Sequence, residues 1–161
     1  MTDYYKAIAR DHDNGTISWT YLPRPGAMKG VGEDIWKGSV SIEVPLAAYS
    51  TGFDPDIDFA HMKKLNNVIT KNIFLEDGRI DSTMSPGFVA SLDDMPSSLV
   101  STMSSWYRMS YVDESMVPLI RDYFAERPDV LPGEYLYESR MAIHGLVELK
   151  RYEKFGCAAS R

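Results

Sequence analysis

Cysteine is almost absent from this chain. Its one cysteine, Cys157, has no partner for an internal disulfide bond, which excludes a disulfide-stapled fold. We therefore expect a reducing, cytoplasmic setting. Residues 1–15 carry charges every few positions and lack the apolar core of a secretory signal. No apolar run approaches the roughly 20 residues that a membrane-spanning helix needs, so we expect no membrane association.

The common signatures of nucleotide and hydrolase sites are also missing. There is no G-x-x-x-x-G-K-[ST] loop, and the glycines of GAMKGVG do not follow the dinucleotide-binding spacing. Neither G-x-S-x-G nor H-E-x-x-H occurs. The sequence thus identifies no catalytic residue and predicts no cofactor, and it favours a binding protein over an enzyme.

Basic residues are scarce in two parts of the chain. The whole chain has 17 Lys and Arg against 23 Asp and Glu, a net charge of −6, which disfavours direct binding to a phosphate backbone. No base lies between Lys37 and Lys63, and Arg79 is the one base between Lys71 and Arg108. The acids of these two segments are Glu43, Asp54, Asp56, Asp58, Glu76, Asp77, Asp81, Asp93 and Asp94. They can form an ordinary solvated surface or steer a basic partner.

The length of 161 residues and the apolar fraction of 44% are typical of a single folded domain. Strand patterns come first and helical patterns follow. We therefore predict one α+β domain over residues 1–161, an N-terminal antiparallel β-hairpin or meander followed by three to four helices packed on one face.

Residues 4–10 and 16–22 are predicted to be strands joined by a type I′ turn at Asn14-Gly15, because Asn-Gly between such runs is a strong hairpin signal. Residues 39–44 alternate apolar and polar side chains, which predicts a third strand. A weaker hairpin is predicted around Asp77-Gly78.

The remaining segments have helical spacing. We predict a helix capped by Asp56 or Asp58 that runs to about Asn72, a long loop over residues 82–98, and a short helix that includes Trp106. Another helix is predicted to carry Pro118 in its first turn. Residues 134–155 fit a long helix, although their alternation also fits a strand and Gly145 weakens the helix.

Two clusters could carry chemistry. Asp54, Asp56, Asp58 and His61 have the spacing to converge on a hard cation if the loop folds around it, although helix capping explains the acids more simply. His12 lies between Asp11 and Asp13, which could orient a general base, although a solvated hairpin end is the simpler interpretation. A small metal-assisted or acid/base hydrolase is therefore the alternative function. The other two residues considered, His144 and Cys157, are interpreted as a packed histidine and an incidental thiol.

Aromatic residues are numerous, with 10 Tyr, 3 Trp and 6 Phe. Most will fill the core, but Trp36 and Tyr49 lie outside a clear core stripe and are candidates for an interface. With the acids Asp54, Asp56, Asp58, Asp77, Asp81, Asp93 and Asp94 they form our candidate partner-binding set. We interpret the chain as a small acidic protein of the immunity, antitoxin or virus-encoded inhibitor type that inhibits a basic protein partner. A structural or assembly subunit that forms homo-oligomers through its aromatics is a third interpretation.

Overall fold

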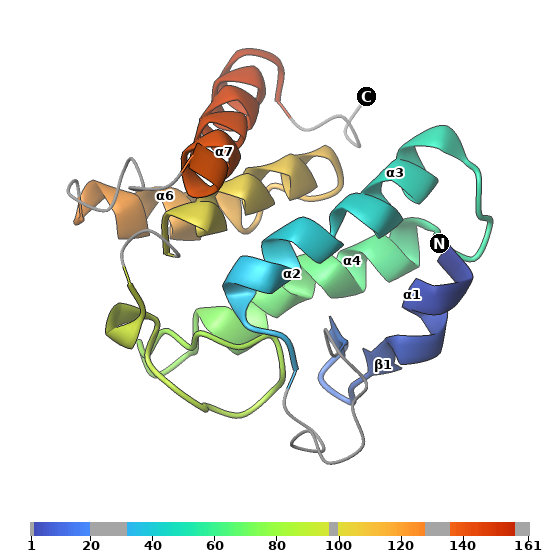
Figure 1. The fold of residues 1–161 in the computed structure, drawn as a ribbon, viewed down its shortest axis with the longest axis horizontal. Helices are drawn as coiled ribbons and strands as arrows, with labels where there is room; N and C mark the ends of the chain where they lie inside the picture. The colour runs from blue at the N-terminus through green and yellow to red at the C-terminus, as the bar shows by residue number, and fades with distance from the viewer. Residues whose placement is uncertain (1, 20–31, 97–99, 128–135, 157–161) are drawn as a thin grey trace. The chain divides into compact units, whose positions relative to one another are not determined.

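The computed structural model describes residues 2–19, 32–96, 100–127 and 136–156. These residues form a short hairpin and a series of helices joined by loops. Figure 1 shows their arrangement within two compact units, Met1–Ser91 and Leu92–Arg161. The elements are α1 (Thr2–Ile8), β1 (Arg10–Asp11), β2 (Ile17–Ser18), α2 (Ile35–Ser41), α3 (Glu43–Thr51), α4 (Phe59–Asn67), the π-helix η1 (Val68–Ile73), the 3₁₀-helices η2 (Leu92–Asp94) and η3 (Ser101–Tyr111), α6 (Val117–Ala125) and α7 (Leu136–Phe155). The predicted α+β class with an N-terminal antiparallel hairpin is confirmed.

The hairpin turns at Gly15, although not in the predicted type I′ conformation. Arg10 pairs with Ser18 and Asp11 with Ile17. Gly15 has φ +75° and donates its N–H to the carbonyl of His12, whereas no described non-glycine residue has a positive φ. A type I′ turn needs two left-handed residues, so the connection is instead a three-residue loop with one left-handed glycine.

Two predicted strands are helices. Residues 4–10 lie largely in α1, and residues 39–44 span the end of α2 and the start of α3. The signal for α2 is its cap, since the Asp34 carboxylate accepts the backbone N–H of Lys37 at 2.9 Å. The alternation over these residues does not mark one buried face, because Ser39 and Ile42 are fully buried whereas Val40 is 39% exposed. The described residues therefore hold a two-stranded hairpin and no meander.

Helix α4 begins where the sequence predicts. The Asp58 side chain accepts the backbone N–H of His61 at 2.8 Å and so caps the helix. The apolar stripe continues through the π-helix and is fully buried at Met62, Leu65 and Ile69. Helix α4 packs on β2, and α1 packs on α3.

The short hairpin predicted around Asp77-Gly78 is present as a single bridge between Phe74 and Ile80. The loop that follows is irregular over residues 82–91, and it leads into η2.

In the second unit, α7 packs along η3. The contact is close at Gly145, where a Cβ atom would lie 2.1 Å from the carbonyl oxygen of Ser104. The predicted helix with Pro118 in its first turn is α6, and the C-terminal pattern is helical rather than extended. The side chain of His144 and all of Cys157 lie outside the described residues.

Candidate functional site

An apolar groove lies beside helix α3 in the first unit. Its volume is about 480 Å³, and it is lined by Thr2, Glu43, Val44, Ala47, Ala48, Thr51 and Phe53. The Phe53 side chain is 78% exposed, the largest exposure among the large apolar side chains of the described residues. A phenyl ring exposed to this extent leaves apolar surface in contact with water. A partner that covered this surface would gain binding free energy.

The end of α3 places Phe53 at the groove. Gly52 adopts the left-handed conformation with φ 65°, and its N–H donates to the carbonyl of Tyr49 at 3.3 Å. The N–H of Phe53 donates to the carbonyl of Ala48 at 3.2 Å. This glycine-based helix stop satisfies the last carbonyls of α3 and turns the chain at Phe53.

The charges near the groove are acidic. Glu43 lines it, and all lining residues except Thr2 belong to the base-free segment between Lys37 and Lys63. Lys6, a basic residue of α1, forms ion pairs with Asp54 at 3.1 Å and with Asp56 at 2.9 Å. Hydrogen bonds with Asp56 and Asp54 raise the pKa of Lys6, and the bond with Lys6 lowers the pKa of Asp54. Lys6 thus stays protonated, and the two aspartates balance its positive charge within the first unit.

The other members of the predicted metal set are used separately. Asp58 caps α4, and His61 lies 2.8 Å from the hydroxyl of Tyr5 through its Nε2 atom. Burial, followed by the nearby Lys64, lowers the pKa of His61. Within the described residues no three His, Cys, Asp or Glu side chains are grouped to hold a metal ion.

The predicted acid/base cluster of the hairpin is likewise dispersed. The imidazole of His12 bonds to the hydroxyl of Ser18 at 2.7 Å through Nε2, while Asp11 pairs with Lys64 at 2.6 Å. Asp13 is exposed at the turn. The structure therefore shows neither Asp11 nor Asp13 bonded to the His12 imidazole.

The second acidic segment is the stretch between Lys71 and Arg108, and several of its acids form contacts with nearby residues. Asp77 pairs with Arg79 at 2.7 Å. Asp81 is fully buried and accepts backbone N–H groups from Thr83 and Val89, so the expectation that it is an exposed loop charge is wrong. Its carboxylate instead fixes the loop that follows.

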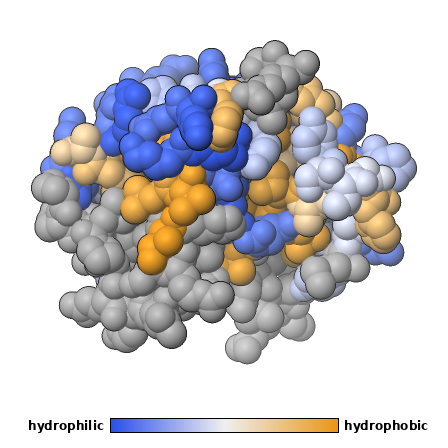
Figure 2. Space-filling model, turned by 90° about the horizontal axis from the view of Figure 1, so that it is seen from above, coloured by the Kyte–Doolittle hydropathy of each residue, from blue (hydrophilic) through white to orange (hydrophobic). Residues whose placement is uncertain are grey.

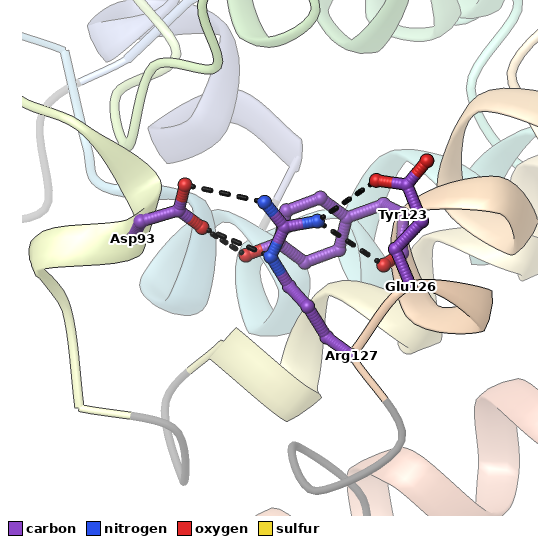
Figure 3. A network of polar contacts seen from close by, with 4 residues as sticks. All are labelled: Asp93, Tyr123, Glu126 and Arg127. Carbon is purple, nitrogen blue, oxygen red and sulfur yellow. Dashed lines mark hydrogen bonds and ion pairs between the residues drawn. The ribbon is translucent and has the colours of Figure 1, made fainter.

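In the second unit, Asp93 belongs to a network drawn in Figure 3. Arg127 donates from Nε at 3.2 Å and from Nη2 at 3.3 Å to the two oxygens of Asp93, and its guanidinium lies 4.1 Å over the Tyr123 ring. Tyr123 donates its hydroxyl to Asp93 at 3.0 Å, and burial raises the pKa of that phenol. Asp94 next to it is exposed.

The two predicted aromatic anchors are half-buried. Tyr49 lies on α3 without lining the groove, and Trp36 lies on α2 under Lys37, whose Nζ is 5.6 Å from the ring centroid. The indole N–H of Trp36 is buried without a hydrogen-bond partner among the described residues. The exposed aromatic at the groove is Phe53, which the sequence reasoning missed. The Thr51-Gly52 helix stop directly before it was the available signal.

Large apolar side chains reach the surface in both units. Figure 2 shows such surface in orange among hydrophilic residues on the face that it presents. No described helix is both long enough and apolar enough to cross a bilayer. Comparisons with models of protein families, with curated proteins and with solved structures found no match.

Proposed function

We propose that this chain is a binding protein that inhibits or neutralises a basic protein partner, and that the α3 groove is its docking surface. The supporting observation is the combination of the 78% exposed Phe53 ring with an apolar groove in which the one charged residue of the described lining, Glu43, is acidic. Apolar anchors seated in a groove supply most of the affinity in protein interfaces, and complementary charge accelerates encounter.

The groove selects against acidic partners as well. Lys6 of α1 is bound by Asp54 and Asp56, so these two acids balance its positive charge. A partner segment with an apolar side chain flanked by Lys or Arg fits these features. Binding such a segment covers the partner's basic surface and neutralises its charge.

A selection from a random-peptide display library tests this proposal even while the natural partner is unidentified. We expect the selected peptides to share an apolar residue flanked by Lys or Arg, and we expect their binding to weaken as salt rises. Amide shifts in a ¹⁵N spectrum should map to α3 and Phe53. Enrichment of acidic or uncharged peptides, or binding mapped elsewhere, would contradict the proposal.

A further inference from the structure

A second cleft in the first unit has a different chemistry. Its volume is about 750 Å³, and its lining includes Lys71, Leu75, Glu76, Asp77, Arg79 and Phe88. This volume falls within the roughly 300–1,000 Å³ of clefts that hold small ligands. The lining comes from the hairpin loop, the π-helix, the turn at residues 75–79 and the loop at residues 87–88.

The π-helix holds one wall of this cleft. It carries Thr70 and Lys71, and it is anchored from below by the buried Asn72, which donates to Thr16 Oγ1 at 3.0 Å and to the Met84 carbonyl at 2.7 Å. Asn14 of the hairpin loop donates to the Asn72 side chain at 2.9 Å. A π-helical turn is rare and occurs often at functional sites, because its wider turn re-aims side chains.

Of the four charged side chains that the described residues bring to the cleft, two neutralise each other. Asp77 and Arg79 form an ion pair at 2.7 Å, and the Arg79 guanidinium lies 4.5 Å over the Phe88 ring. The ring is still 39% exposed. Arg79 and Phe88 thus form a stacked wall in which the charge of Arg79 is paired with that of Asp77.

The other two charges, on Lys71 and Glu76, are opposite in sign and lack ionic partners among the described residues. The ammonium of Lys71 donates to the carbonyl of Asn14 at 2.7 Å, which leaves two of its three donors. Glu76 is exposed in the turn. A cation and an anion in one cleft, together with the apolar Leu75 and Phe88, match a ligand that carries both charges.

We propose that this cleft binds a short peptide with free termini. The peptide carboxylate meets Lys71, its ammonium meets Glu76, and an apolar side chain packs on Leu75 and Phe88. This inference is independent of the α3 groove, because no described residue lines both sites.

Calorimetric and ¹⁵N NMR titration with the dipeptide Ala-Phe tests the inference. The matched probes are its N-acetylated form, its C-amidated form and free phenylalanine. We expect saturable binding of the free dipeptide with amide shifts at Asn14, Thr70 and Gly87. Removing either terminal charge should weaken binding by about twofold to fivefold, because Lys71 and Glu76 are both exposed and exposed ion pairs contribute little.

Two variants test which side chain binds which terminus of the peptide. Glu76→Gln should weaken the free dipeptide and leave the affinity of the acetylated form unchanged, whereas Lys71→Gln should leave the amidated form unchanged. Asp3→Asn, an exposed carboxylate of α1 outside the cleft, is the control and should change nothing. A thermal melt of each variant reports whether the hairpin contact of Lys71 has been lost.

Failure of Ala-Phe to bind, or equal effects of both variants on both capped forms, would overturn the inference. Tighter binding of free phenylalanine than of the dipeptide would also overturn it, because the ligand would then be a single amino acid.

Discussion

The indole N–H of Trp19 donates to Oε2 of Glu33 across 2.5 Å, and Ser41 donates to the same oxygen at 2.9 Å. Glu33 is 4% exposed, and its second oxygen, Oε1, has no hydrogen-bond partner among the described residues. Burial raises the pKa of this carboxyl to about 7, despite the two hydrogen bonds that act in the opposite direction. The sequence offered no signal for this site.

This carboxyl makes stability depend on pH. The folded state keeps a proton on Glu33 that the unfolded state has already lost above the ordinary glutamate pKa of 4.5. The contribution is therefore fully present below pH 4.5 and is lost as pH rises to about 7, at up to about 1.4 kcal/mol per pH unit.

Glu33→Gln should flatten this dependence. The amide retains a carbonyl oxygen for Trp19 and Ser41 and does not titrate. We expect urea unfolding between pH 5 and pH 7 to show a smaller loss of stability in the variant than in the wild type. Parallel profiles for the two proteins would show that Glu33 is ionised throughout.

The close contact between Gly145 of α7 and Ser104 of η3 leads to a second prediction. Gly145→Ala would place a Cβ 2.1 Å from a backbone oxygen, so α7 and η3 must separate. We expect a loss of about 2 to 3 kcal/mol in unfolding free energy. Val147→Ala on the same helix is the control, because a side chain that is 56% exposed should cost within about 0.5 kcal/mol. Equal stability of the two variants would show that the helices do not depend on this glycine.

Two aspartates between Lys71 and Arg108, Asp77 and Asp81, should behave differently. Asp81→Asn removes one of the acceptor oxygens that bind the N–H groups of Thr83 and Val89, and it should cost about 1 to 3 kcal/mol. Asp77→Asn should leave the melting temperature almost unchanged, because its pair with Arg79 is exposed. Thermal melts compare them directly, and a neutral Asp81→Asn would mean that the loop is fixed by other contacts.

Local signals predicted much of the fold. The Asp58 cap, the Pro118 start of α6 and the left-handed Gly15 are set by neighbours within a few residues. The strand prediction failed over residues 4–10 because tertiary contacts override β propensity there. Tyr5 is buried in α1 with its ring 5.4 Å from that of Trp19, a contact that no local pattern reveals.

The use of the acidic residues was harder to predict. Lys6 and Asp54 are far apart in the sequence, yet they form an ion pair, so the sequence overstates the free charge near α3. Asp81 and Asp93 are engaged in the same way by partners within their own units. The sequence thus located the acidic segments but not the groove or Phe53.

Truncation of Phe53 should affect binding without affecting folding. We expect Phe53→Ala to raise the dissociation rate of a selected basic peptide by about tenfold or more, because an apolar anchor acts mainly on the off-rate. Its stability should change by no more than about 0.5 kcal/mol, because the ring is 78% exposed. An unchanged dissociation rate would show that Phe53 does not contact the bound peptide.

The groove is tested most directly by two arginine substitutions on the same helix. Ala47 is exposed and lines the groove, whereas Ser50 is exposed on α3 and does not line it. Ala47→Arg fills the groove and adds a positive charge, while Ser50→Arg adds the same charge beside it. We predict that the dissociation constant of a selected basic peptide rises at least about tenfold for Ala47→Arg and far less for Ser50→Arg. Equal affinities for the two variants would contradict docking in the α3 groove.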